Sequence, residues 1–335
     1  MALPDWHPER LAARLPYLAA RNRLLAATRA HFGATGYTEV QTPALVPSPG
    51  AEVHLAAFES EFIPHLGAGE ARRLYLRTSP ELAIKRLLAG GVGPVFEIAR
   101  VWRNGEIGRT HAPEFTMLEW YRPGLTLDGL MDETEAYLRA VWPACPAAPF
   151  RRVTMAQAFA RWCGGLDILA SIRADGSGDG PALLAAAAAA GLAPGPQGED
   201  WESVFFRLML DHVEPALAEH PSFLTHWPSP QAALARRDMA DPRQALRFEL
   251  FAGGMELANA FEELTDPAEQ RRRLEADMAE RARLHGAAWP VDEDFLAALE
   301  HGMPDCAGIA LGLDRLVMLV TGAGRIGDVQ WLPWG

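Results

Sequence analysis

Cysteine is scarce in this 335-residue sequence, and its three copies, Cys145, Cys163 and Cys306, lie far apart. Their spacing matches neither a disulfide framework nor a zinc site, in which the ligands come in closely spaced groups. Chains without such cross-links are typical of reducing compartments, so we expect a cytoplasmic location.

Long apolar runs are also missing. The most apolar stretch, residues 183–192, is mostly alanine, and it is well short of the roughly 20 residues that cross a bilayer. The first residues show no basic segment followed by an apolar one, so no signal peptide is predicted. We therefore do not expect a membrane-embedded protein.

Basic residues are outnumbered, with 31 Lys and Arg against 43 Asp and Glu and a net charge of −12. Nonspecific nucleic-acid binding depends on cationic side chains that neutralise phosphates, so this balance disfavours it, although a local basic patch remains compatible with it. Hydrophobic residues make up 49% and charged residues 22% of the chain, as is usual in packed soluble proteins. The composition excludes a disordered tail, a collagen and a coiled coil.

Helices and hairpin-connected strands are both predicted from apolar periodicity and from Gly and Pro stop signals. The predicted helices cover residues 10–36, 81–88 and 267–285, the strands cover 37–43, 94–102, 114–121 and 247–257, and residues 308–319 form a strand followed by a helix. Ser79 is expected to cap the second helix, with Pro80 in its first turn. Hairpins rather than alternating βαβ units predict an α+β fold with an antiparallel sheet. The Ala-, Pro- and Gly-rich segment at about 143–200 is expected to be a helical surface insertion with flexible joints.

The first candidate site lies on the segment 247–259, where Gly253-Gly254 predicts a two-residue hairpin turn. Residues directly opposite each other share a face, so Glu256 lies across from Phe251, and alternation places Glu249 on the same face. Two converging carboxylates repel each other unless a cation lies between them. Mg²⁺ held together with nucleotide phosphates is the usual solution.

This interpretation has an alternative and a difficulty. The alternative is that the two glutamates are solvated on an exposed sheet face. The difficulty is that strict alternation turns Asn259 and Glu263 away from Glu256. A shared site therefore requires a bulge or a turn, which the sequence pattern does not itself supply.

The second candidate site spans Arg103 to Tyr121. An arginine at a strand end presents a planar fork to a carboxylate or phosphate, and Arg109 and His111 lie in a loop that can close on a polyphosphate. The strand that follows would form an aromatic platform beside a carboxylate, because alternation gives one face to Phe115, Met117, Glu119 and Tyr121. The alternative is a core strand with a solvated Arg109, but the run is too polar for a simple core hairpin.

The third candidate site spans Gly308 to Leu319. Small residues in its strand allow a ligand or another backbone to approach closely. Arg315 lies in the first turn of the following helix, where the helix dipole disfavours a cation. Its position suggests a partner, either a phosphate or an aromatic base on which the guanidinium stacks. The alternative is a surface ion pair with Asp314.

These segments resemble the motifs of class II aminoacyl-tRNA synthetases. Residues 103–121 resemble motif 2, residues 308–319 resemble motif 3, and residues 10–36 with Pro43 resemble motif 1, which forms dimers. The pattern is closest to lysyl-tRNA synthetases in Thr78-Ser-Pro-Glu-Leu82, in residues 113–121 and in residues 247–267. Three separated motifs in order make the resemblance specific, and it implies one class II catalytic domain over residues 1–335, with an antiparallel β-sheet flanked by helices.

A lysyl-tRNA synthetase also carries an N-terminal anticodon-binding domain, whereas motif 1 here begins almost at Met1. The sequence is therefore more similar to elongation factor P–(R)-β-lysine ligases, a resemblance supported by Gly302-Met-Pro-Asp-Cys306 and by Ala310, where lysyl-tRNA synthetases usually carry Gly. The resemblance implies a homodimer that uses ATP and Mg²⁺ to activate lysine or (R)-β-lysine as an adenylate. It further implies transfer to a lysine of elongation factor P, with tRNA not expected as a partner.

The resemblance also implies roles for individual residues. Arg103 and Arg315 are the expected catalytic residues, with Arg103 on the α-phosphate and the substrate carboxylate and Arg315 sandwiching the adenine with Phe115. The expected ATP-binding residues are Arg103, Asn104, Gly105, Glu106, His111, Ala112, Phe115, Glu256, Leu257, Gly312 and Arg315. The expected amino-acid-binding residues are Ser79, Pro80, Glu81, Tyr121, Asn259, Glu263 and Ala310, with Glu81 near the α- or β-amino group and Tyr121 and Glu263 near the ε-ammonium. Glu249 and Glu256 are the expected Mg²⁺ ligands.

Two positions depart from the family pattern, and two other functions are compatible with the motifs. Gly105 replaces a common Glu and Ala112 replaces a usual Asn, both in the loop expected to fold over ATP. One alternative is a truncated lysyl-tRNA synthetase-like enzyme that acylates tRNA. The other is a non-catalytic paralogue that senses amino acids, although such proteins tend to lose the arginines and carboxylates that this sequence retains.

Overall fold

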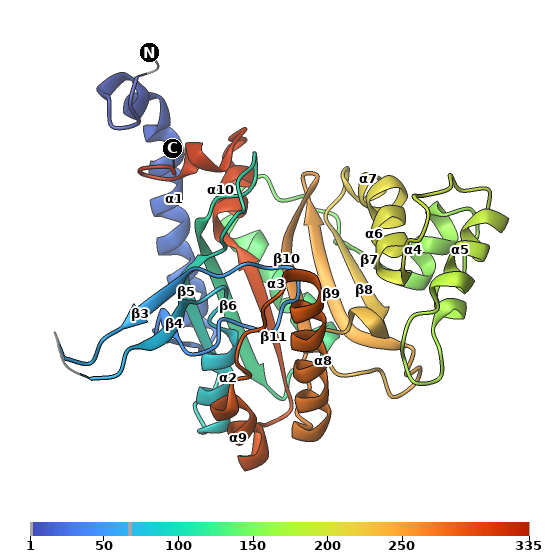
Figure 1. The fold of residues 1–335 in the computed structure, drawn as a ribbon. Helices are drawn as coiled ribbons and strands as arrows, with labels where there is room; N and C mark the ends of the chain where they lie inside the picture. Colours follow the sequence, from blue (N-terminus) through green and yellow to red (C-terminus); the bar gives the residue numbers. More distant parts are fainter. Residues whose placement is uncertain (1–2, 66–68, 335) are drawn as a thin grey trace.

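The computed structural model describes residues 3–65 and 69–334, and an eight-stranded sheet forms the centre of these residues (Figure 1). In spatial order the strands are β1 (Thr38–Glu39), β5 (Val95–Trp102), β6 (Glu114–Pro123), β11 (Cys306–Gly312), β10 (Met255–Glu262), β9 (Gln244–Ala252), β8 (Ser222–Pro228) and β7 (Arg151–Thr154). The inner pairs are antiparallel, as expected. The outermost pairs, β1 with β5 and β7 with β8, are parallel, because long connections allow each edge strand to return in the same direction.

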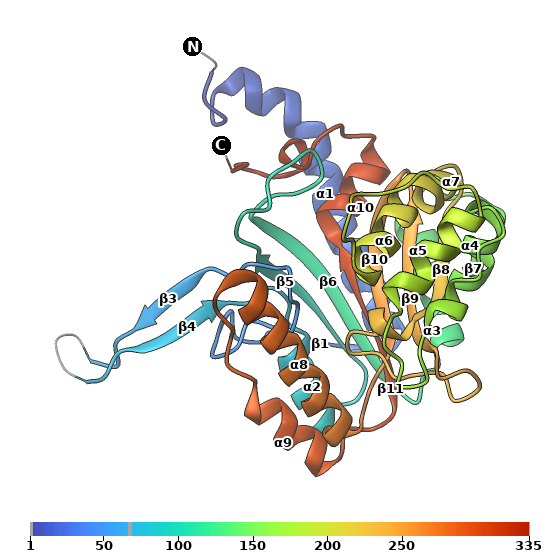
Figure 2. The ribbon, with the colours of Figure 1, turned by 45° about the vertical axis from the view of Figure 1, so that its right-hand side comes forward.

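Helices cover both faces of the sheet (Figures 1 and 2), which gives the expected α+β architecture. One face packs against α1 (Pro8–Ala34), α3 (Leu127–Val141) and α10 (Leu313–Thr321), with a 3₁₀ turn at Ile326–Val329 beside them. The other face packs against α2 (Glu81–Ala89), α8 (Pro267–His285) and α9 (Glu293–Gly302). Within the described residues, no helix is long and apolar enough to cross a membrane.

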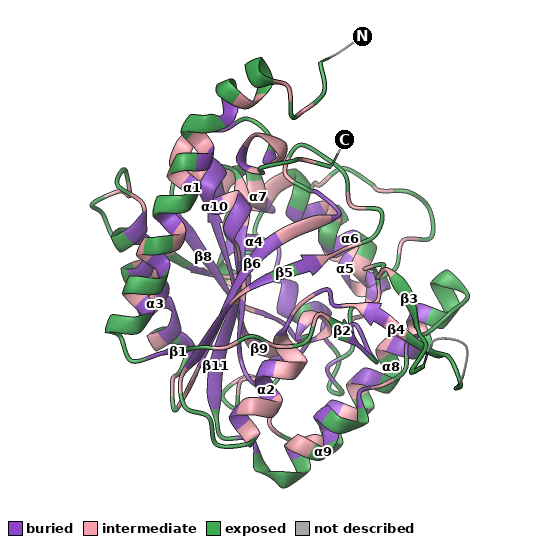
Figure 3. Cartoon of the chain, turned by 90° about the vertical axis from the view of Figure 1, so that its left-hand side faces the viewer, coloured by how far each residue is buried: buried purple, intermediate pink, exposed green. Residues whose placement is uncertain are grey.

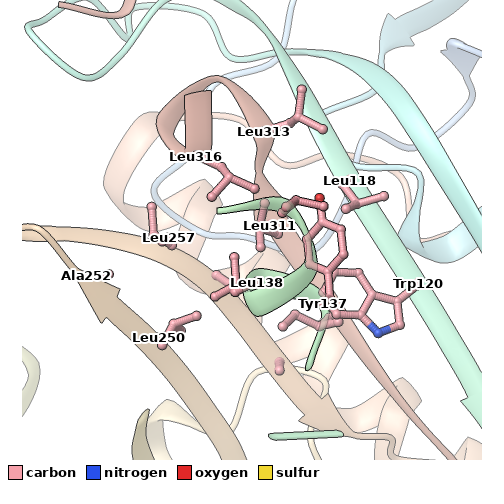
Figure 4. Packing of buried hydrophobic residues seen from close by; sticks show 14 of the residues in the cluster. Leu118, Trp120, Tyr137, Leu138, Leu250, Ala252, Leu257, Leu311, Leu313 and Leu316 are labelled. Carbon is pink, nitrogen blue, oxygen red and sulfur yellow. The ribbon is translucent and has the colours of Figure 1, made fainter. Parts of the chain in front are cut away.

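Alternation along β6 separates the core from the site. Leu118 and Trp120 point into the main core, where they meet Tyr137 and Leu138 of α3 (Figure 4). Figure 3 shows the same division for the whole sheet, with buried strands inside and exposed outer surfaces on α1 and α9. The odd-numbered residues of β6 face the opposite side, so one strand both anchors the core and supplies side chains to a cavity.

Residues 151–217 form a packed helical region beyond β8 (Figure 1). It contains β7, α4 (Met155–Trp162), α5 (Gly180–Ala189), α6 (Trp201–Leu208) and α7 (Glu214–Leu217), with a 3₁₀ turn at Ile168–Ser171 and a π-helical turn at Met209–Val213. Phe205 stacks between Phe159 and Trp201, with ring centres 5.6 and 5.0 Å apart. The helical region thus extends beyond the expected segment 143–200. Its alanine-rich helix α5 packs against α6, whose buried aromatic residues Trp201 and Phe205 come after residue 200.

A smaller sheet lies at the edge of the molecule. Its strands are β2 (Leu45–Val46), β4 (Arg72–Leu76) and β3 (Glu59–Phe62), in that spatial order. Figure 2 shows β3 and β4 extending away from the main body as a hairpin. The short 3₁₀ turn at Ser229–Gln231 leads from β8 toward the cavity described next.

Candidate active site

A cavity of about 620 Å³ lies on the face of the sheet that carries α2 and α8. Its floor is made by β6, β10 and β11, and its walls by the segment 49–55, the loop 103–112 and the two helices. Most of the residues singled out from the sequence line it, namely Ser79, Glu81, Arg103, Glu106, His111, Ala112, Phe115, Tyr121, Glu249, Glu256, Leu257, Asn259, Ala310, Gly312 and Arg315. Segments from across the chain therefore meet in one space.

Four of the expected site residues are not among those that line the cavity. Pro80 is the N-cap of α2, a position that we had expected Ser79 to hold. Asn104 is exposed, and its backbone N–H donates to the carbonyl of Ala56 at 2.7 Å. Gly105 has a φ of +82°, a backbone conformation that favours glycine over residues with a side chain. The fourth residue, Glu263, is buried behind the cavity wall.

The β9–β10 hairpin has the expected turn. Gly253 and Gly254 both have positive φ, at +59° and +71°, and Glu256 pairs with Phe251. The strand register then shifts between Glu256 and Ala258, so that β10 contains a bulge. The bulge was not predicted, and it resolves the difficulty raised by strict alternation, because it places Asn259 directly opposite Glu249.

Arg247 organises the carboxylate of Glu249. Its Nη2 donates to Glu249 Oε1 at 2.6 Å, its Nε donates to Asn259 Oδ1 at 3.1 Å, and its guanidinium lies 4.1 Å from the centre of the Trp227 ring. Burial raises the pKa of Glu249 to about 8, the carboxylate of Glu256 adds to the shift, and Arg247 opposes it. Arg247 therefore offsets only part of the cost of burying the Glu249 carboxylate beside that of Glu256.

Arg315 connects the hairpin to the loop of the second candidate site. Its Nη1 donates to the carbonyl of Glu256 at 2.8 Å and lies 3.7 Å from that residue's carboxylate. Its Nη2 lies 2.7 Å from His111 Nε2, which must accept because a guanidinium only donates. Burial and the charge of Arg315 lower the pKa of His111, which favours the neutral ring that this contact requires. Asp314 instead forms a buried ion pair with Arg21 of α1, which excludes the surface pair with Arg315.

Arg103 faces the same space from the end of β5. Its guanidinium lies 5.2 Å from the centre of the Phe115 ring and 3.7 Å from the carboxylate of Glu106. Arg109, in contrast, is exposed and is not among the residues that line the cavity. Arg103, His111 and Arg315 all line the cavity, and the charges of both arginines contribute to the lowered pKa of His111.

A hydrogen-bonded network closes the far end of the cavity. Ser79 Oγ donates to Glu119 Oε1 at 2.6 Å and accepts from the N–H of Glu81 at 2.9 Å. Tyr121 OH donates to Glu119 Oε2 at 2.9 Å. Burial and the carboxylate of Glu81 raise the pKa of Glu119 to about 8. A Cβ atom at Gly308 would lie 2.0 Å from the Tyr121 ring, so only glycine leaves room for this tyrosine.

Lys85 is the residue at this end that the sequence analysis missed. Its ammonium is fully buried and lies 2.5 Å from Glu81 Oε1 and 2.5 Å from Glu263 Oε2. Burial opposes its charge, but the carboxylates of Glu263 and Glu81 raise the pKa of Lys85 above its usual value. The four-residue spacing between Glu81 and Lys85 on one helix was the available signal, since such residues are neighbours on a helix surface.

Comparisons with known proteins agree with this geometry. The family model of class II tRNA synthetases (D, K and N) matches residues 11–334. A protein of Proteus mirabilis (strain HI4320) named elongation factor P–(R)-β-lysine ligase is 40% identical over 333 residues, covering 99% of this chain and 98% of its own. A protein of the same name from Salmonella paratyphi B is 42% identical over 326 residues, covering 97% of this chain and 96% of its own.

The chain belongs to the elongation factor P–(R)-β-lysine ligase family of class II synthetases. This membership confirms the resemblance drawn from the three motifs, the class II fold and the ligase class of enzyme. The D, K and N group also explains why the pattern of lysyl-tRNA synthetases was recognisable in the hairpin 247–267.

The carboxylates of this ligase-family chain suit a magnesium ion shared with a nucleotide. Glu249 and Glu256 lie on one face of the hairpin and both line the cavity. Among the residues that the structure describes, no three or more His, Cys, Asp or Glu side chains form a group that could hold a metal. Mg²⁺ commonly binds through one or two carboxylates together with phosphate oxygens and water. The oxygen donors present therefore fit an ion that arrives with ATP.

Proposed function

We propose that this protein uses ATP to activate lysine or (R)-β-lysine as an adenylate and then transfers the aminoacyl group to a lysine of elongation factor P. The observation that carries the proposal is the charge at the far end of the cavity. There the single ammonium of Lys85 lies between two carboxylates, Glu81 and Glu263. A substrate with a second amino group supplies the missing positive charge, whereas a neutral side chain leaves a buried carboxylate without a partner.

The other end of the cavity suits a triphosphate. Arg103, Arg315 and His111 present nitrogen atoms toward one region, and guanidinium groups bind phosphate oxygens through parallel hydrogen bonds. Glu249 and Glu256 would hold a magnesium ion that helps to neutralise the phosphates. Phe115 offers an aromatic face on which the adenine can stack, with Arg315 on the other side of the base.

The proposed reaction needs no nucleophile from the protein. A carboxylate oxygen of the amino acid attacks the α-phosphorus of ATP, the bond to the bridging oxygen breaks, and pyrophosphate leaves. The neutral amine of the acceptor lysine then attacks the carbonyl carbon of the adenylate, an amide forms, and AMP leaves with the bonding electrons. The chain contributes orientation and positive charge, which together account for large rate accelerations in such transfers.

Two other functions are less well supported. A tRNA substrate is disfavoured by the net charge of −12, because tRNA binding relies on cationic surface. A non-catalytic amino-acid sensor has no need for arginines and carboxylates directed at a triphosphate, yet both sets face the cavity here. We therefore propose elongation factor P as the acceptor, as the name of the relatives from Proteus and Salmonella indicates.

We further propose a homodimer and a cytoplasmic location. Leu3 and Trp6 at one end of the described chain, and Trp331, Leu332 and Trp334 at the other, are exposed. Both ends lie beside α1 (Figure 1), so this apolar surface is next to the helix that resembles the dimer-forming motif. The three cysteines are free, which agrees with a reducing compartment. Sedimentation velocity measures the oligomeric state and contradicts the dimer if only monomer is found.

Mass spectrometry of the acceptor tests the proposed reaction. Purified elongation factor P is incubated with the protein, ATP, Mg²⁺ and one amino acid at a time, with (R)-β-lysine, L-lysine and L-leucine in separate reactions. We expect the mass of the factor to increase by one lysyl group with a diamino acid and to stay unchanged with leucine. Modification by leucine, or tRNA acylation in a parallel reaction without modification of the factor, contradicts the proposal.

A further inference from the structure

Lys85 is the buried charge that the reaction just described does not use. It lies on α2, one helical turn after Glu81, and its ammonium has no exposure to solvent. An isolated buried ammonium is strongly disfavoured, so a fully buried lysine requires partners that stabilise its charge. Its partners are Glu81 and Glu263, the two residues assigned above to the amino groups of the substrate.

Glu263 is held by only one of its two oxygens. Both oxygens are buried and neither makes a hydrogen bond with a described residue, but Oε2 lies 2.5 Å from the Lys85 ammonium in an ion pair, whereas Oε1 has no such partner among the described residues. The free oxygen points toward Gly308, since a Cβ atom there would lie 2.9 Å from it. Gly308 lines the cavity, so the unpartnered oxygen lies just behind a glycine in the cavity wall.

We propose that Lys85 contributes to the amino-acid specificity of this site as a positioning residue, whose ammonium favours the ionised form of Glu263 and leaves one carboxylate oxygen free for a substrate ammonium. The proposal rests on the proposed function, because it concerns the same amino-acid pocket. Lys85 does not touch the reacting atoms. It acts through Glu81 and Glu263, and its charge decides whether the buried carboxylate can pair with a diamino acid.

The surroundings of Glu263 agree with this role. Burial raises the pKa of Glu263 to about 8, the ammonium of Lys85 opposes the rise, and Glu81 adds to it. Two other titratable groups face Glu263, namely Tyr121 of β6 and Cys306 of β11. The carboxylate of Glu119 acts on Tyr121, and the charges of Asp305 and Arg236 act on Cys306. Burial raises the pKa of Tyr121 and of Cys306, so both stay neutral in the pH range in which Glu263 titrates.

The substitution Lys85→Met tests the proposal, since it removes the charge and keeps most of the side-chain length. Isothermal titration of L-lysine or (R)-β-lysine is carried out between about pH 6.5 and 9.5. Affinity falls on the acid side of the pH profile, and we call this part of the profile the acid limb. We expect the acid limb to move to higher pH by about one pH unit or more, because without the ammonium Glu263 holds its proton to higher pH. At neutral pH the affinity falls about tenfold or more, since each unit of pKa changes the ionised fraction tenfold. Raising the pH restores it.

Three further variants make the result decisive. Lys85→Gln also removes the charge but keeps polar atoms in the buried slot, so it serves if the methionine variant fails to fold. Arg86→Met is the matched control, because it removes the neighbouring cation of α2, which faces Asp292 and Asp294 outside the cavity. The Glu263→Gln variant, with and without Lys85→Met, shows whether Glu263 or Glu119 is the group whose protonation weakens binding. Because Glu263→Gln removes the carboxylate on which Lys85 acts, we expect Lys85→Met to cause no further shift of the pH profile in that variant.

The outcomes distinguish this proposal from the proposed function. A shifted limb in both Lys85 variants, with ATP affinity and the Arg86→Met profile unchanged, supports it. A wild-type protein that binds diamino acids, together with Lys85 variants whose acid limb and affinity do not move, overturns the role of Lys85 alone. A wild-type protein that binds only neutral amino acids overturns both.

Discussion

Replacing Gly308 with alanine is the sharpest mutational test of the amino-acid end of the cavity. Gly308 pairs with Tyr121 across β6 and β11, and a Cβ atom would lie 2.0 and 2.1 Å from two ring carbons of that tyrosine. Carbon atoms in contact prefer separations of about 3.5–4.0 Å, so the ring would have to move by roughly 1.5 Å. Tyr121 has little freedom to move, because it is buried and its hydroxyl donates to Glu119.

The expected cost follows from this overlap. Inserting a methyl group into a packed site costs about 1–3 kcal/mol. Because each kcal/mol lowers Tm by about 2–4 °C in chains of somewhat smaller size, we expect a fall of roughly 2–12 °C. A displacement of about 1 Å near reacting groups can cost about 100-fold, so the KM for the diamino acid should rise roughly 10–100-fold. The KM for ATP should stay within about twofold, since the atoms nearest to a Cβ at Gly308 belong to Tyr121 and Glu263 rather than to Arg103 or Arg315.

The assay is ATP–pyrophosphate exchange with each substrate varied in turn, together with a thermal unfolding scan. Gly324→Ala serves as the control, because a Cβ atom there has no heavy atom within 4 Å and the residue has no positive φ. An alanine at position 308 that lowers neither the Tm nor the affinity for the diamino acid would refute the close packing of Tyr121 and its role in the pocket. Equal losses of affinity for ATP and for the amino acid would refute the assignment of the two substrates to separate ends of the cavity.

Other predictions concern the phosphate end, the metal, the pH dependence and the stability of the fold. Arg315→Ala should lower the exchange rate about 100–1000-fold, as loss of a preorganised donor does elsewhere, and near-normal exchange would contradict its role. Glu256→Gln should raise the Mg²⁺ concentration needed for half-maximal exchange, and an unchanged Mg²⁺ titration would exclude it as a ligand. The pKa of Glu263 is raised to about 8 by burial, so calorimetry should show tighter diamino-acid binding as pH rises toward about 8.5 and protonation is lost. Arg21→Met breaks the buried pair with Asp314 and should cost about 3–5 kcal/mol of unfolding free energy in denaturant titrations.

The parts of the site that could be predicted from the sequence are those that local geometry determines. The Gly253-Gly254 turn fixes the register of the hairpin, so the convergence of Glu249 and Glu256 follows from alternation alone. The face shared by Phe115 and Tyr121 likewise follows from the period of a single strand. Each of these relations involves residues close in the chain.

The parts that escaped prediction depend on contacts between distant segments. The bulge after Glu256 arises in β10, which pairs with β9 on one side and β11 on the other, so its position is a property of the sheet. The contact of Lys85 with Glu263 joins α2 to the end of β10, and only its helical half, Glu81 with Lys85, was visible as a spacing. The helices after residue 200 and the parallel edge strands also depend on long connections that periodicity does not determine.

ATP–pyrophosphate exchange by the wild-type protein measures whether one cavity activates a diamino acid with ATP. Exchange is measured with (R)-β-lysine, L-lysine, L-leucine and L-methionine at equal concentrations and saturating Mg²⁺ and ATP. We expect rapid exchange with a lysine isomer and little above background with the two neutral amino acids. Exchange that is as fast with leucine or methionine, or absent with both lysine isomers, would contradict it.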